Sequence, residues 1–265
     1  MNVIYYNIVD LNKMLDIFEA CKTSNLAEVV RLLTEGDDVN ATNTYQMTPL
    51  HIAAKNGYTD IVVALLDAGA RINITDTFKF TPLDYASLDG HYETISVLLA
   101  KGAHVNTTDN TITPLHYTSS KGYKNIVKLL LINGADVNAT DRMNTSALHY
   151  ASEGGHNEVV KLLLAAGANI NARNVNNYTP LHFGCLKGHK HVVLTLLAMG
   201  AEIDVVNDTN DTPLHLASGK GYKITVILLL SAGANSNIQN VSNKTPLQCA
   251  SSEGHKEVVM ILTRR

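Results

Sequence analysis

The sequence predicts an all-α repeat solenoid, and three observations with one shared period support this. A four-residue box close to Thr-Pro-Leu-His occurs seven times at nearly constant spacing. All six prolines lie in these boxes, and fourteen of the 17 glycines recur at two fixed places between them. A period of about 33 residues is typical of folds whose units stack on their neighbours. The boxes begin at Thr48, Thr81, Thr113, Ser146, Thr179, Thr212 and Thr245.

Each box predicts the start of a first helix. A threonine such as Thr48 can cap the helix, because its hydroxyl accepts a backbone N–H of the first turn. Proline follows at the first helical position, where its missing N–H is harmless. Nine residues after the threonine stands a glycine such as Gly57, which suits a left-handed helix end.

A second helix is predicted after that glycine. Apolar residues have helical spacing in segments such as 61–66 and 159–164. Another glycine followed by alanine, such as Gly69, ends this helix, and a short extended piece such as 136–139 leads to the next box. One such unit cannot bury its apolar face alone, so we expect about eight units to stack.

The boxes and glycines resemble the ankyrin repeat, with its pattern TPLH-x-A-A-x-x-GH and a later GA-(D/N)-(V/I)-N. The unit from Asn174 to Asn207 follows this pattern closely, and the match covers roughly Leu11 to Leu262. The resemblance implies helix–turn–helix units with β-hairpin fingers, stacked in a curved array. It also implies that partners bind at the finger tips and the inner helices.

Several residues depart from the family pattern. The glycine usual two residues before the threonine is absent, and asparagine, which tolerates left-handed geometry, stands there in four units. Gln46 and Lys79 stand there in the first two boxed units and predict altered fingers. Asp84 and Gln248 replace the box histidine, and Ala147 replaces the proline of the fourth box.

The repeats predict one domain without a linker. We expect an N-terminal extension at 1–10 and a single ankyrin-repeat domain at 11–265. Within it, a capping repeat would span 11–42, and further repeats would start near 43, 76, 109, 141, 174, 207 and 240. The last repeat is truncated and would serve as a C-terminal cap.

Composition argues against several classes of protein. The net charge is −3 with both signs mixed, which favours neither nucleic acid nor a membrane surface as partner. The three cysteines lie in distant repeats, so we expect a reducing compartment and no disulfide framework. We expect a monomer in the cytoplasm or nucleus, or in a host cytosol if the chain is an effector.

The sequence predicts neither catalysis nor a metal or cofactor. Nine of the eleven histidines fall on two periodic positions, so we expect structural roles, with each box histidine linking neighbouring loops. Cys185 has His182 and His189 nearby, but it stands at a packing position normally held by alanine. No nucleotide, hydrolase or zinc signature is present, so we expect no enzyme and no small-molecule substrate.

Partner-binding residues are predicted where the repeat itself requires no particular residue. These are the finger tips and the two residues before the first glycine of each unit. Large apolar side chains gather there in the first three boxed units and could form one patch, although some could simply pack between fingers. The sixth and seventh units look polar. The predicted set is Tyr45, Met47, Phe78, Phe80, Leu88, Ile112, Arg142, Met143, Tyr178 and Leu186.

Two further patterns have open interpretations. Lysines recur around the turn between the helices, for example Lys187/Lys190 and Lys220/Lys223, and form either a solvated face or a basic stripe for an acidic partner. Asn40, Asn138 and Asn171 resemble substrates of an ankyrin-directed asparaginyl hydroxylase.

The predicted function is a non-catalytic scaffold or adaptor that binds a protein or peptide on its concave surface. One alternative is a proteasome-assembly chaperone of the gankyrin type, whose last boxes also read TPLH and TPLQ. Another is a bacterial or viral ankyrin effector that acts on host proteins.

Overall fold

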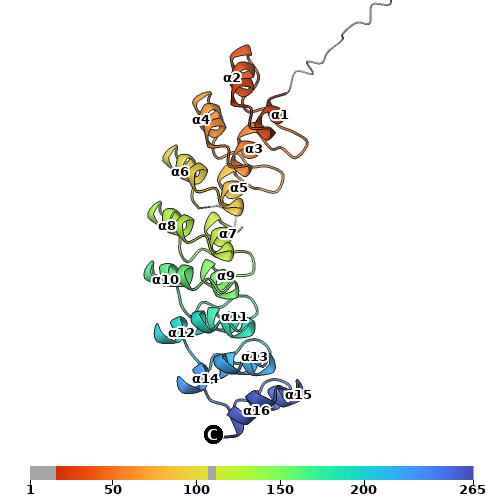
Figure 1. The fold of residues 1–265 in the computed structure, drawn as a ribbon, viewed down its shortest axis with the longest axis vertical. Helices are drawn as coiled ribbons and strands as arrows, with labels where there is room; N and C mark the ends of the chain where they lie inside the picture. Colours follow the sequence, from red (N-terminus) through yellow and green to blue (C-terminus); the bar gives the residue numbers. More distant parts are fainter. Residues whose placement is uncertain (1–15, 107–111, 265) are drawn as a thin grey trace, which may run out of the picture. The chain divides into compact units, whose positions relative to one another are not determined.

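The computed structural model describes residues 16–106 and 112–264, which form consecutive pairs of helices (Figure 1). They fall into two compact units, 1–104 and 105–265, each described here by itself. The first unit holds α1 (Ile17–Lys22), α2 (Leu26–Glu35), α3 (Pro49–Lys55), α4 (Thr59–Asp67), α5 (Pro82–Asp89) and α6 (Tyr92–Ala100). The second holds α7 (Pro114–Lys121), α8 (Lys124–Ile132), α9 (Ala147–Glu153), α10 (Asn157–Ala165), α11 (Pro180–Lys187), α12 (Lys190–Ala198), α13 (Pro213–Gly219), α14 (Lys223–Ser231), α15 (Pro246–Ser252) and α16 (Lys256–Thr263).

The predicted stacking of helix pairs is confirmed within each unit. In the second unit the first helices of the pairs pack in the order α7, α9, α11, α13 and α15. Their second helices pack in parallel order from α8 to α16, and we call these the outer helices. The single domain predicted at 11–265 stays a prediction, and the expected extension at 1–10 lies outside the described residues.

The boxes begin helices as the sequence predicts. Thr48 caps α3, and its backbone N–H donates to Nδ1 of His51 over 3.0 Å. Where the histidine is missing, another acceptor takes that N–H: Asp84 Oδ2 at 2.8 Å in α5 and Gln248 Oε1 at 2.8 Å in α15. All seven boxes therefore form reciprocal caps, even where the motif departs from the family pattern.

Small buried residues let the first helices of the pairs, which we call the inner helices, approach one another. Ala53, Ala86, Ala151, Ala217 and Ala250 are all fully buried. Leucines and valines of the second helices, such as Leu65 and Val160, fill the layer between the two helices of a pair. Within each unit the core is thus a thin apolar layer that continues from repeat to repeat.

The fingers are tight turns, and the expectation of altered first fingers is wrong. Gln46 and Lys79 adopt left-handed φ angles of 58° and 67°, close to the 54° of Asn144. The same hydrogen bond closes these turns, because Lys79 N–H donates to the Asp76 carbonyl over 3.1 Å and Asn144 N–H to the Asp141 carbonyl over 3.0 Å. In the described residues only Thr140 and Ser146 form a β-bridge.

Both sets of periodic histidines have structural roles. Nε2 of the box histidine His149 lies 3.0 Å from the Tyr178 carbonyl of the next finger, so the predicted link between loops is confirmed. His189 of the second set lies over Gly155 of the preceding repeat, and its Nε2 reaches the Glu153 carbonyl at 2.8 Å. Since backbone carbonyls only accept, both rings carry their proton on Nε2.

Candidate functional site

In the first unit two large rings project from adjacent fingers. Tyr45 is 58% exposed and Phe78 is 66% exposed. Their fingers are joined by the backbone, because Thr77 N–H donates to the Tyr45 carbonyl over 3.0 Å. The two rings are therefore held by a fixed backbone while they face solvent, which suits aromatic anchors of a binding surface. We call Tyr45 and Phe78 the aromatic tips.

The other predicted residues of the first unit are only partly exposed. Met47, Phe80 and Leu88 are half-buried. The Phe80 ring packs 5.2 Å from that of Tyr85. The Tyr85 hydroxyl in turn donates to Asp76 Oδ2 over 2.7 Å, which ties helix α5 to the turn of its own finger. Phe80 thus helps to fix the finger, and its contact with a partner stays a prediction.

In the second unit a smaller apolar pair occupies adjacent finger tips. Met143 and Val175 are exposed, and Val175 N–H donates to the Met143 carbonyl over 2.9 Å. Arg142 and Ile112 are exposed as well. Ile112 belongs to this unit and not to that of the aromatic tips, so the six-residue patch predicted from the sequence stays a prediction.

Tyr178 and Leu186 lie deeper than the finger tips. Tyr178 is half-buried and packs 5.5 Å from the ring of His182 and 5.4 Å from that of Phe183. Its ring therefore supports its own repeat, as Phe80 does in the first unit. Leu186, at the end of α11, is half-buried and lines a groove on the inner helices.

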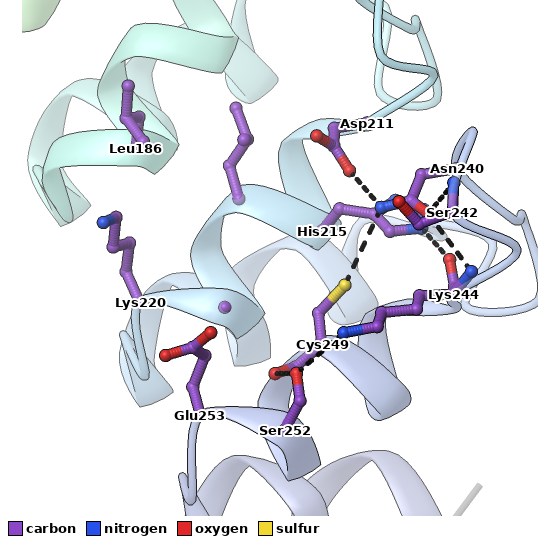
Figure 2. Close-up of a pocket in the computed structure, with 12 residues that line it drawn as sticks. Leu186, Asp211, His215, Lys220, Asn240, Ser242, Lys244, Cys249, Ser252 and Glu253 are labelled. Carbon is purple, nitrogen blue, oxygen red and sulfur yellow. Dashed lines mark hydrogen bonds between the residues drawn. The ribbon is translucent and has the colours of Figure 1, made fainter.

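Figure 2 shows this groove, which has a volume of ≈ 350 Å³ and is lined from α11, α13, α15 and the last finger. Asn240 Nδ2 donates to Asp211 Oδ1 over 2.8 Å and lies 4.0 Å from Cys249 Sγ. Lys244 Nζ reaches Ser252 Oγ at 3.4 Å. The groove combines one apolar wall at Leu186 with both acidic and basic groups, so it suits a polar segment of a partner.

Two lysines on the inner helices have a partner. Lys187 Nζ lies 3.2 Å from Glu153, and Lys55 Nζ lies 5.5 Å from the centre of the Tyr85 ring. These exposed contacts add little stability. The inner face therefore carries mixed charge and favours neither an acidic nor a basic partner as a whole.

Two exposed valines were missing from the predicted set. Val175 shares the tip position with Arg142, one repeat further on. Val241, on the finger predicted to be polar, is 61% exposed. The sequence carried the signal, because Val241 stands one repeat after Asp208 at the finger-tip position. The two apolar residues at that position in the described repeats, Val175 and Val241, are both exposed.

The three asparagines of the hydroxylation hypothesis connect neighbouring repeats. Oδ1 of Asn138 accepts the backbone N–H of Asn169 over 2.8 Å, and its Nδ2 donates to the Gly167 carbonyl over 3.1 Å. Asn40 and Asn171 accept in the same way from Arg71 and Glu202 at 2.8 and 2.9 Å. Each side chain is held by the next repeat, and their hydroxylation stays a prediction.

The thiols are protonated at neutral pH. Burial, with a smaller effect of Asp16, raises the pKa of Cys21 to about 12. Burial also raises the pKa values of Cys185 and Cys249. A thiol, unlike a thiolate, is a poor nucleophile, so the burial of Cys185 works against a nucleophilic role.

Clustered metal ligands and membrane-spanning helices are not found in the described parts of the chain. Within 16–106 and 112–264, no three His, Cys, Asp or Glu residues come together in a group that could hold a metal ion. None of the helices in these ranges is long and apolar enough to cross a membrane.

The sequence model of the ankyrin repeats (3 copies) matches residues 17–109, 81–141, 115–207 and 181–265. These matches cover most of the chain, which therefore belongs to the ankyrin-repeat family, and the resemblance seen in the boxes is confirmed. Ankyrin repeats are protein–protein interaction modules and are generally non-enzymatic. A comparison with curated proteins finds no significant match.

Proposed function

We propose that the chain is a monomeric, non-catalytic adaptor of the cytoplasm that holds a protein or peptide on its fingers and inner helices. The observation that carries this proposal is the pair of aromatic tips, Tyr45 and Phe78, which are exposed on fingers with a fixed backbone. Rings that are already ordered lose little conformational entropy on binding. Exposed aromatic groups also supply much of the affinity in protein interfaces.

A capture experiment with two matched variants tests the proposal. Tyr45→Ala/Phe78→Ala removes the aromatic tips, whereas Ile132→Ala removes an equally exposed apolar side chain at the end of α8. We expect partners from a lysate of the source organism to be lost from the first variant and retained by the second. Circular dichroism checks that both variants fold.

Partners retained by both variants would contradict a role of the aromatic tips. In that case, variants of Met143 or of Lys220 and Lys244 at the groove would locate the site in the second unit. For a purified partner we expect the Kd of the tip variant to be at least about thirtyfold weaker, since two rings are lost and each costs about 1 kcal/mol or more.

The two narrower alternatives rest on the sequence pattern alone. A proteasome-assembly chaperone of the gankyrin type would bind a proteasomal ATPase, which a direct binding assay tests. An effector that acts on host proteins would be found by a secretion assay, and its partners would come from a host lysate instead.

A further inference from the structure

The outer helices of the second unit carry an apolar row that the repeat does not require. Leu194 in α12, Ile227 in α14 and Met260 in α16 occupy the same position of three consecutive repeats and are 52%, 41% and 50% exposed. Equivalent positions in α8 and α10 hold Lys128 and Lys161. We call Leu194, Ile227 and Met260 the outer stripe. Ile224, one turn before Ile227, is exposed and widens it.

A row of lysines accompanies the outer stripe. Lys190, Lys223 and Lys256 each stand four residues before a member of the stripe, and all three are exposed. Residues four apart lie on one face of a helix. Each of the three helices therefore presents one lysine and, one turn further on, one apolar side chain.

The charge of this face differs from that of the whole chain. The outer helices α8 to α16 contain six lysines and two glutamates, while the net charge of the chain is −3. Both glutamates are already paired, Glu158 with Lys124 and Lys161 at 3.4 and 2.8 Å, and Glu257 with Lys223 at 2.9 Å. No ion pair of Lys190 or Lys256 occurs in the described ranges. The face thus has positive charge available for an acidic partner.

The spacing of the rows matches that of an α-helix. Packed helices lie about 8–10 Å apart, which sets the separation of the stripe's members across α12, α14 and α16. Residues seven apart in an α-helix are separated by about 10 Å along its axis. A partner helix that lies across the outer helices could therefore contact each member of the stripe with every seventh residue. Acidic residues beside those positions on the partner helix could contact the lysines.

We propose that the outer stripe and its lysines dock an acidic amphipathic helix of a partner protein, on a surface separate from the fingers. A second copy of this chain fits poorly, since a symmetric contact through the stripe would bring the lysine rows together. A membrane surface also fits less well. Interfacial anchoring buries apolar groups about 5–10 Å deep, whereas these residues are only about half exposed.

Fluorescence anisotropy with a labelled synthetic peptide tests the proposal on the full chain. The peptide is an amphipathic helix of about 18 residues, with leucine at every seventh position and glutamates one turn away. The matched peptide carries lysine in place of glutamate. We expect the acidic peptide to bind at least about tenfold more tightly than the basic one, with an affinity that falls as salt rises.

Three variants distinguish the possible outcomes. Leu194→Ser/Ile227→Ser/Met260→Ser is expected to weaken binding of the acidic peptide about tenfold or more. Lys190→Glu/Lys256→Glu should reverse the preference between the two peptides. Met143→Ser/Val175→Ser changes equally exposed finger residues and should leave the affinity within about twofold. Because all these side chains are exposed, each variant is expected to fold, which circular dichroism checks.

The proposal is overturned if the acidic peptide does not bind. It is also overturned if the variant of the outer stripe and the variant of Met143 and Val175 weaken binding of the acidic peptide equally. Vesicles of phosphatidylcholine and phosphatidylserine in equal parts provide the remaining comparison. One outcome would favour an anionic membrane over the proposed helix. In it, the protein sediments with these vesicles, the stripe variant does not, and the acidic peptide does not bind.

Discussion

At the scale of single residues, the inner helices bury serine hydroxyls that have no partner. Ser87, Ser119, Ser152 and Ser218 stand at the seventh position counted from the start of their boxes, which Ala54 holds in the first boxed unit. A buried hydroxyl without a hydrogen bond loses its solvation without compensation. These serines therefore weaken the contact between repeats, although they are small enough to pack there.

Two serine-to-alanine changes in the same repeat compare a hydroxyl without a partner with one that makes a hydrogen bond. Ser152→Ala is expected to raise the free energy of unfolding by about 1 kcal/mol, because it removes an unpartnered group. Ser146→Ala should lower it by about 1 kcal/mol, because Ser146 caps α9 and its Oγ lies 2.8 Å from His149 Nδ1. Urea unfolding followed by circular dichroism measures both, and equal losses would contradict the first expectation.

Lys79 allows a second test at the residue scale. Its left-handed φ of 67° is strained for a side chain without a compensating hydrogen bond. Lys79→Gly should therefore raise the free energy of unfolding by about 1 kcal/mol. The converse change, Asn144→Lys, should lower it by about 0.5 kcal/mol, since asparagine tolerates this region better than lysine. Both follow from urea midpoints, and a loss on Lys79→Gly would show that the wider freedom of glycine in the unfolded chain dominates.

At the scale of elements, the two glycines that end the helices of a repeat differ in their surroundings. A Cβ at Gly155, after α9, would lie 2.7 Å from Nδ1 of His189, whose ring is held by the Glu153 carbonyl. A Cβ at Gly167, after α10, would meet nothing within 4 Å. Both residues have positive φ, 74° and 88°. Only the first glycine is therefore also a site of close contact between repeats.

Alanine substitutions separate the cost of left-handed backbone strain from the cost of the clash with His189. Gly167→Ala is expected to lower the free energy of unfolding by about 1 kcal/mol, from left-handed strain alone. Gly155→Ala should cost about 3 kcal/mol, because the clash with the imidazole adds to the same strain. Thermal unfolding of the two variants provides the comparison. Equal costs would mean that His189 moves aside without loss of its hydrogen bond.

The elements also show what the sequence could predict. Caps, terminators and histidine links follow from local chemistry repeated in every unit, so one pattern predicted them all. The exposure of side chains that the repeat pattern does not fix depends instead on how neighbouring side chains pack. Phe80 and Tyr178 pack on Tyr85 and Phe183, which the sequence did not predict, and their contact with a partner stays a prediction. The outer stripe was not predicted, because its members lie on the second helices, whose apolar residues at helical spacing were all assigned to the core.

At the scale of the whole molecule, five buried histidines couple folding to pH. Burial lowers the pKa of His51, His116 and His215 below its usual range, and lowers those of His149 and His182 to about 4. Each ring accepts a backbone N–H on Nδ1, so protonation would break a cap as well as place a charge in the core. The unfolded chain takes up these protons near pH 6.5, whereas the folded chain does so only near pH 4 in the two clearest cases.

Stability should therefore be complete above pH 6.5 and decline as the pH falls towards 4. His149 and His182 would each remove on the order of 2 kcal/mol between pH 7 and 5. Asp84 acts in the opposite sense, because burial raises its pKa to about 6 and its carboxyl is easier to keep buried once protonated. Because one carboxyl opposes five imidazoles, we expect a net loss of folding stability as the pH falls. Urea midpoints at pH 7.5, 6 and 5 measure it.

A glutamine at the box position provides the control, since Gln248 already accepts the cap N–H of Thr245 over 2.8 Å. His149→Gln should be less stable than the unchanged protein at pH 7.5, because it loses the link to the Tyr178 carbonyl. Its urea midpoint should nevertheless fall less steeply as the pH is lowered, because one of the five buried histidines no longer contributes to the loss. The same steepness in both proteins would assign the acid sensitivity to other groups, whereas a flatter curve would assign part of it to this buried ring.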